Sequence, residues 1–225
     1  MVTLADGLIV VAKRDCPTCT MLEPVYARLA EGTADLTVYT QDDPSFPAGV
    51  EGVVDDTELE TSYRLGIETV PTLIRVEDGA ESGRAVGWDR GEWEMLSGLR
   101  ELGEGLPDSQ PGCGSKSVEP GMAETLAVRF GDAKLMARRI EVTEIEDEIE
   151  ACYDRGWSDG LPVVPPTEVR VVRMLQGTTR GPQDVVGVIP PNNAECTVEK
   201  VAINAVMAGC KPEYLPVVLA AVEAA

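Results

Sequence analysis

Two cysteines separated by two residues, Cys16 and Cys19, follow closely after the apolar run GLIVVA. Two thiols at this spacing can exchange a disulfide with a partner, supply half of a four-ligand zinc site, or lie inert in a core. A zinc site needs further ligands, but the chain has no second pair of this kind and no histidine. Its other cysteines stand singly at positions 113, 152, 196 and 210. The pattern favours a redox dithiol, and we expect neither a metal nor another cofactor.

The position of the pair indicates which sulfur attacks. A strand expected over residues 7–13 leads into a helix expected from Cys16 to about residue 30. Cys16 then lies at the helix N-terminus, where unpaired N–H groups favour the thiolate. Cys19, one turn deeper and facing inward, is placed to resolve a mixed disulfide. Pro17 suits the first helical position because it has no N–H to leave unpaired.

Charged neighbours bear on the same sulfur. Lys13 and Arg14 add positive potential in a chain that is otherwise acidic, and this favours a thiolate at Cys16. Asp15 is an anion beside Cys16 and opposes it.

A second motif, Val70-Pro71-Thr72, lies far along the chain from the cysteines. A proline is tolerated where it opens a strand, and a cis bond there would turn the chain toward the cysteine-bearing helix. The Val70 backbone would then be free to pair with an extended substrate lying across the two sulfurs. We therefore expect Val70 and Pro71, with Pro17, to bind the substrate.

The elements that must position these residues are expected in the order β-α-β-α-β-β-α over residues 1–102, with a central mixed four-stranded sheet. Residues 103–121, GEGLPDSQPGCGSKSVEPG, are rich in glycine and proline and are expected to be a flexible linker. Residues 122–225 are expected to form a second, mostly helical α+β domain. Its apolar last helix, PEYLPVVLAAVEAA, is expected to be buried on all sides, so we expect either an incomplete domain or a homo-oligomer.

These features resemble the thioredoxin superfamily. The resemblance is carried by VVAKRDCPTC, by the Val-Pro-Thr motif and by Gly87, and it covers residues 1–102. It implies a minimal thioredoxin fold and dithiol–disulfide exchange. The chain departs from the commonest family pattern because Asp15 replaces a tryptophan before the first cysteine and Pro-Thr replaces Gly-Pro between the two.

The second half resembles a different group, the region seen in relatives of UGSC-type selenoproteins and in bacterial thioredoxin fusions. The similar stretches are DGLPVVPPT, IPPNNAEC and VEKVAINAVMAGCKPEYLPVVLAAVEA. The resemblance implies no particular reaction. The defining UGSC motif is absent, and CGSK at 113–116 matches it only in part.

The single cysteines allow two interpretations each. Cys113, in the expected linker, either reaches Cys16 on a mobile tether and exchanges with it or is incidental. Cys196 precedes an expected helix start, which would lower its pKa and make it a second accessory thiol. Cys152 is expected to be a packing residue, and Cys210 a structural thiol.

Composition excludes several classes of function. Acidic residues outnumber basic ones by 39 to 19, and the resulting charge of −20 repels phosphate backbones and anionic lipids. The absence of histidine excludes Ser-His-Asp and Cys-His catalysis. There is no secretion-signal pattern and no apolar run of membrane-spanning length, so we expect a cytoplasmic protein with neither nucleic-acid nor membrane partners.

The sequence therefore predicts a thiol–disulfide oxidoreductase. Its expected partners are a protein or small-molecule disulfide, a cellular thiol reductant and its own C-terminal domain, to which it would supply electrons. Two other interpretations stay open: a binding or assembly module that uses the same fold, and an enzyme whose chemistry lies wholly in residues 122–225.

Overall fold

The computed structural model describes residues 5–32, 35–131, 133–142 and 147–225. The chain has a mixed α/β fold and divides into two compact units, Met1–Leu126 and Ala127–Ala225. No helix among the described residues combines the length and the apolar composition needed to cross a bilayer.

The first unit is built on a mixed sheet whose strand order is β3-β2-β1-β5-β6. Its strands are β1 (Gly7–Ala12), β2 (Leu36–Thr40), β3 (Val54–Asp55), β5 (Thr72–Glu77) and β6 (Ala80–Val86). β1 pairs in parallel with β2 and antiparallel with β5. It is central and buried on both faces, which explains its continuous apolar sequence.

The sheet has five strands, so the four-stranded prediction was wrong by one. The additional strand β3 pairs in parallel with the end of β2 and lies before α3 (Glu60–Arg64), where the expected element order has no strand. Two residues are too short to show the alternation that marks a strand in a sequence. The adjoining Asp56 holds the segment in place, because its N–H donates to the Thr40 carbonyl and its buried carboxylate accepts the Ser62 N–H.

The helices of this unit are α1 (Pro17–Met21), α2 (Glu23–Gly32), α3 (Glu60–Arg64) and α4 (Arg90–Ser97). The single helix expected from Cys16 to residue 30 is therefore two helices that meet at Leu22. The break follows from Pro24, which has no N–H to donate to the Thr20 carbonyl one turn earlier. A short α1 carrying both cysteines is thus separated from the longer α2.

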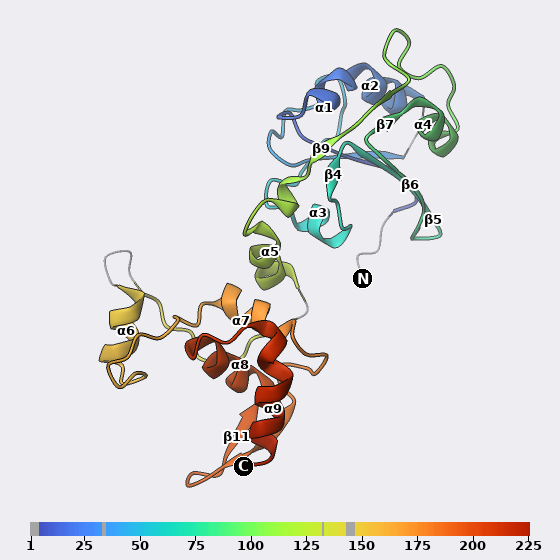
Figure 1. The fold of residues 1–225 in the computed structure, drawn as a ribbon. Helices are drawn as coiled ribbons and strands as arrows, with labels where there is room; N and C mark the ends of the chain where they lie inside the picture. Colours follow the sequence, from blue (N-terminus) through green and yellow to red (C-terminus); the bar gives the residue numbers. More distant parts are fainter. Residues whose placement is uncertain (1–4, 33–34, 132, 143–146) are drawn as a thin grey trace. The chain divides into compact units, whose positions relative to one another are not determined.

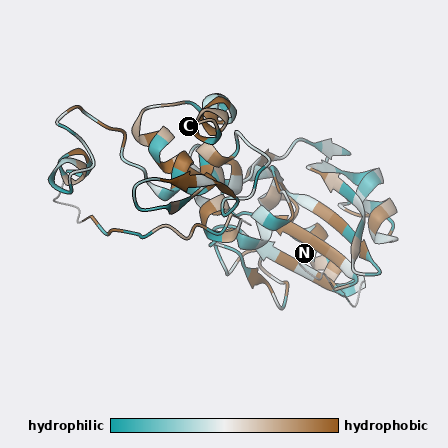
Figure 2. Cartoon of the chain, turned by 90° about the horizontal axis from the view of Figure 1, so that it is seen from below, coloured by the Kyte–Doolittle hydropathy of each residue, from teal (hydrophilic) through white to brown (hydrophobic). Residues whose placement is uncertain are grey.

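Helices cover both faces of the sheet, with α2 and α4 on one side and α3 on the other (Figure 1). Aromatic side chains join α2 to α4: the ring centroids of Tyr26 and Trp93 are 6.2 Å apart, and those of Trp88 and Trp93 are 5.4 Å apart. All three side chains are buried. The hydrophobic strands run through the middle of this unit in Figure 2.

Residues 103–121 do not form the flexible linker that their composition predicts. They contain β8 (Ser109–Gln110), β9 (Cys113–Gly114) and the 3₁₀ helix η1 (Lys116–Val118). β8 pairs with β7 (Trp88–Asp89), and β9 pairs with β4 (Thr69–Val70). Small and polar residues are found both in solvated linkers and in strands that lie close to another backbone. Composition alone therefore gave the wrong prediction of a flexible linker. The segment belongs to the first unit.

The second unit combines helices with a hairpin. Its elements are α6 (Glu148–Asp154), α7 (Glu168–Leu175), β10 (Val185–Ile189), β11 (Ala194–Thr197), α8 (Val198–Met207), η2 (Pro212–Tyr214) and α9 (Leu215–Glu223), while α5 (Met122–Phe130) spans the boundary between the units. α9 is not buried on all sides, because Leu215 and Leu219 face the core while Val217 is 72% exposed. The sequence of residues 143–146, Thr143 to Glu146, predicts a helix-capping box, and these residues lie outside the described ones. The cap of α6 is the Asp147 carboxylate.

Candidate functional site

Cys16 lies where the sequence predicts it, at the N-terminus of the helix that follows β1. It is the N-cap residue of α1, with extended backbone angles, and its sulfur accepts the Cys19 N–H at 3.4 Å. Pro17 occupies the first helical position. The cysteine side chain thus takes the role that serine or aspartate usually fills, and it meets a free backbone donor of the first turn.

This position makes Cys16 acidic. Its pKa is lowered to about 5, first by a hydrogen bond from the Cys19 thiol, then by one from the Cys113 thiol and by the backbone N–H groups of Cys19 and Thr18. Burial opposes the shift, since the side chain is only 1% exposed. A buried sulfur that is nevertheless ionised at neutral pH has the state required of an attacking nucleophile.

Cys19 has the opposite character. It is fully buried, and burial raises the pKa of its thiol strongly, with a further contribution from the neighbouring Cys16. The Tyr26 hydroxyl is buried nearby and has no hydrogen-bond partner of normal geometry; burial and the proximity of Cys19 raise the pKa of this hydroxyl as well. The Cys19 thiol therefore keeps its proton and donates a hydrogen bond to the Cys16 sulfur for as long as Cys16 is reduced.

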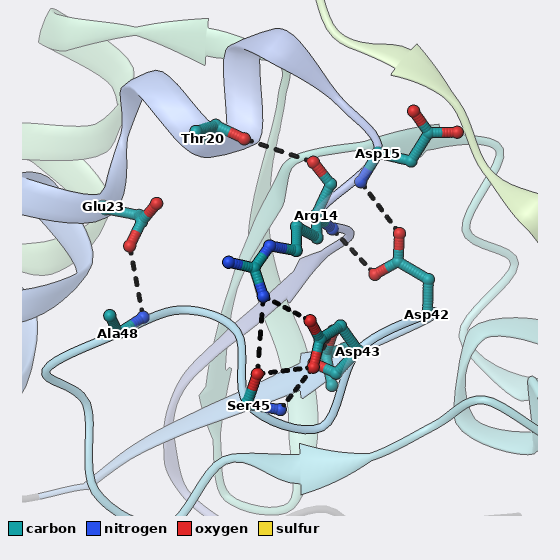
Figure 3. A network of polar contacts seen from close by, with 9 residues as sticks. Arg14, Asp15, Thr20, Glu23, Asp42, Asp43, Ser45 and Ala48 are labelled. Carbon is teal, nitrogen blue, oxygen red and sulfur yellow. Dashed lines mark hydrogen bonds and ion pairs between the residues drawn. The ribbon is translucent and has the colours of Figure 1, made fainter.

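The turn that presents Cys16 is held by acidic residues after β2 (Figure 3). The Asp42 carboxylate accepts the N–H of Arg14 at 2.7 Å and that of Asp15 at 2.8 Å. The Arg14 guanidinium pairs with Asp43, whose pKa falls to about 2 through hydrogen bonds from Ser45 and Arg14. Arg14 was expected to add positive potential at Cys16, but its charge is compensated by Asp43. The low pKa of Cys16 comes from hydrogen bonds to its sulfur.

The proline motif lies against the cysteines. The Val70–Pro71 peptide bond is cis, and the Val70 carbonyl oxygen is 3.6 Å from the Cys16 sulfur. Contact between the two motifs is thus present as expected. The Val70 backbone is not free for a substrate, however, because it pairs with Cys113 in the β4–β9 ladder. Substrate binding by Val70, Pro71 and Pro17 stays a prediction that requires this edge to open.

The segment carrying Cys113 runs beside β4 as β9 (Figure 1). Side chains on both sides of this ladder dock it. The Thr18 hydroxyl donates to the Pro111 carbonyl at 2.8 Å, and the Lys13 ammonium donates to the Gly114 carbonyl at 2.9 Å. Gly112 lies so close to β4 that a Cβ atom there would come within 2.5 Å of the Val70 carbonyl oxygen. Further along, the Ser117 hydroxyl donates to the Ile67 carbonyl at 2.6 Å.

Sequence reasoning underestimated Cys113. We expected it on a mobile tether; it lies on β9, half-buried, with its thiol against Cys16. Burial and the contact with Cys16 raise its pKa, while the Lys13 ammonium acts in the opposite direction. One signal in the sequence was relevant, because glycines on both sides of Cys113 permit a close approach of backbones.

The cysteines of the second unit lie on or next to different elements: Cys152 on α6, Cys196 on β11 and Cys210 after α8. Cys152 is buried within α6 as expected, and burial raises its pKa. Cys196, expected just before a helix start, lies on β11, one residue before the cap of α8. That cap is Thr197, whose hydroxyl accepts the Lys200 N–H. Among the described residues, no three His, Cys, Asp or Glu side chains are grouped so that they could hold a metal ion.

Comparisons with protein-family models, with curated proteins and with solved structures gave no match.

Proposed function

We propose that the protein is a thiol–disulfide oxidoreductase of the thioredoxin superfamily, working in the cytoplasm. The observation that carries the proposal is the Cys16 sulfur in the N-cap position of α1, hydrogen-bonded to Cys19 and in contact with Val70. The strand order around β1 and the cis Val70–Pro71 bond support the finer assignment of a minimal thioredoxin fold.

The reaction uses two sulfurs in turn. The Cys16 thiolate attacks one sulfur of a partner disulfide, forms a mixed disulfide and releases the other sulfur as a thiolate, which takes a proton from water. Cys19 then loses its proton and attacks the Cys16 sulfur, so that the Cys16–Cys19 disulfide forms and the second partner thiol leaves. The partner is reduced by two electrons and the protein is oxidised by two. A cellular thiol reductant reverses the change.

The partner is a protein or small-molecule disulfide, and the most economical one is part of the same chain. Residues 122–225, or their substrate, would receive the electrons. Covalent linkage raises the effective concentration of such a partner without any additional contact. The similarity of this half to thioredoxin fusions is consistent with this role.

The test compares Cys16→Ser with Cys210→Ser, a half-buried cysteine of the second unit, in reduction of glutathione disulfide by the dithiothreitol-reduced full chain. Cys16→Ser should reduce the rate to that of buffer alone, because a hydroxyl at neutral pH is not a nucleophile for disulfides. Cys210→Ser should match the wild type. Full turnover by Cys16→Ser would contradict the proposal.

One observation favours the second candidate, a binding or assembly module. The edge of β4 that would receive a substrate is occupied by the chain itself, and Cys16 is almost fully buried. A module of this kind would keep its binding activity in Cys16→Ser, so the same variant separates the two candidates.

A further inference from the structure

The three thiols of the site differ in access to solvent. Cys16 and Cys19 are 1% and 0% exposed, whereas Cys113 is half-buried. In this arrangement a partner from solution meets the Cys113 sulfur first. A direct attack on Cys16 would require β9 to leave β4.

The contact between Cys113 and Cys16 is held from several sides. The ladder places Cys113 opposite Val70, and the Val70 carbonyl is itself 3.6 Å from the Cys16 sulfur. Thr18, on the helix that Cys16 caps, binds Pro111, and Lys13, just before that helix, binds Gly114. Residues on both sides of Cys16 thus fix the segment on both sides of Cys113, as is expected of a built contact between two reacting groups.

We propose that Cys113 is a third redox thiol, which forms a disulfide with Cys16 and carries exchange between the buried Cys16–Cys19 pair and partners in solution. The proposal rests on the proposed function and extends it. It gives β9 the position of a permanently bound substrate strand.

The exchange proceeds in three steps. Starting from the Cys16–Cys19 disulfide, the Cys113 thiolate attacks the Cys16 sulfur, a Cys16–Cys113 disulfide forms, and Cys19 leaves and takes up the proton that Cys113 lost. An external thiolate attacks the Cys113 sulfur, and Cys16 leaves as a thiolate. A second external thiolate attacks the external sulfur bound to Cys113, the external disulfide forms, and Cys113 leaves as a thiolate that takes up a proton. The sum is two external thiols oxidised to one disulfide and the Cys16–Cys19 disulfide reduced to two thiols; the reverse sequence reduces a partner.

The roles match the chemistry of each sulfur. The most acidic thiol, Cys16, is the leaving group in the step that involves solution, and an acidic thiol leaves fastest. The external thiol attacks the more accessible sulfur of the Cys16–Cys113 disulfide. Cys19 never meets the external partner, which suits a sulfur that is fully buried.

Two experiments on the full chain test the relay. In Cys19→Ser, one equivalent of diamide should produce a disulfide between the tryptic peptides 15–28 and 101–116, which carry Cys16 and Cys113. In Cys113→Ser, reduction of the Cys16–Cys19 disulfide by glutathione should slow by at least about tenfold, because exchange then waits for β9 to open. The midpoint of the glutathione redox titration of that disulfide should stay unchanged. Cys210→Ser is the matched control for both measurements.

The outcomes separate the relay from the proposed function. Wild-type rates in Cys113→Ser, with Cys16→Ser inactive, would overturn the relay and leave the oxidoreductase intact. Faster exchange in Cys113→Ser would mean that Cys113 only blocks access to Cys16, and this result would also overturn the relay. Failure to find the linked peptides in Cys19→Ser counts against the relay even where Cys113→Ser does not fold. Full activity in Cys16→Ser would remove both proposals together.

Discussion

The two units of this chain contain three cysteines each, and they use them differently. In the first unit, Cys16, Cys19 and Cys113 come from two separate stretches of sequence and meet at one end of β1. In the second unit, the cysteines lie on α6, on β11 and after α8. The number of thiols is the same, so their chemistry is decided by what surrounds each sulfur.

The surroundings differ in the supply of hydrogen-bond donors. Cys16 is itself the cap of a helix and receives donors from the backbone and from two thiols. Cys152 lies within a helix, where the backbone N–H groups are already paired, and its pKa is raised by burial and, to a smaller extent, by the Glu148 carboxylate. Burial thus suppresses the thiolate in one unit, whereas donors overcome the same penalty in the other.

The second unit also buries a charged group, Glu199, and this group has a structural role. The Glu199 carboxylate is 2% exposed and accepts the N–H groups of Met136 and Ala137 and the Gln183 amide. Its donors hold a segment of chain to α8. The Cys16 sulfur receives donors in a similar way, but it also touches a second sulfur with which it can react.

The two units should differ most in how far their cysteine thiols are ionised at neutral pH. With a pKa of about 5, Cys16 is almost fully ionised at pH 7, whereas an ordinary thiol of pKa about 8.5 is only about 3% ionised. The ultraviolet thiolate absorbance of the reduced protein should fall with a midpoint near pH 5. This transition should vanish in Cys16→Ser and persist in Cys152→Ser.

The same shift has a consequence for stability with a defined sign. The folded-state pKa of Cys16 lies below its unfolded value, so its contribution to stability is complete above the unfolded pKa and is lost as the pH falls toward about 5. The pH dependence of urea unfolding should be shallower over this range in Cys16→Ser. An identical dependence in both proteins would contradict the depressed pKa.

A substitution at Gly112 should have the next largest effect, on stability and on access to Cys16, because Gly112 sets how closely β9 approaches β4. In Gly112→Ala the new Cβ would clash with the Val70 carbonyl oxygen, and overpacking of this kind costs about 1–3 kcal/mol. We expect a lower free energy of unfolding and faster alkylation of Cys16. Gly114→Ala, two residues along the same segment, is the control, because its Cβ would meet nothing within 4 Å. Equal effects of the two variants would contradict the close docking.

Thr18 should have a smaller effect on the same closure. Thr18→Val keeps the shape of the side chain but removes the hydrogen bond to Pro111, which should make opening of β9 easier by about 1 kcal/mol, or roughly fivefold in the Cys16 alkylation rate. Thr20→Val changes an exposed hydroxyl on the same helix, whose acceptors water can satisfy. An unchanged rate in Thr18→Val would show that this bond does not hold the segment.

Tyr26 should give the smallest effect, and a favourable one. Its buried hydroxyl lacks a partner of normal geometry, so Tyr26→Phe should raise the free energy of unfolding of the reduced protein by about 0.5 kcal/mol. Tyr214→Phe, at a position 54% exposed, should leave the stability unchanged. A loss of stability in Tyr26→Phe would mean that the hydroxyl makes a stabilising interaction with Cys19.

Local features of the site could be predicted because their causes are local. A buried apolar strand, a proline at the first helical position and a cysteine before it define the N-cap geometry of Cys16 within a dozen residues. The interruption at Leu22 was missed although its cause, Pro24, is also local. The short strand β3 was missed because two residues display no period.

The sequence alone determined that Cys16 caps a helix and that Cys19 faces the core, since helix geometry follows from neighbours along the chain. Only the tertiary structure decided that Cys113 and Gly114 occupy the edge of β4 and that Cys113 meets Cys16. That docking depends on hydrogen bonds and glycine contacts between residues far apart in sequence. Composition cannot distinguish an extended strand on a partner backbone from an extended strand in water, because both are built from the same small and polar residues.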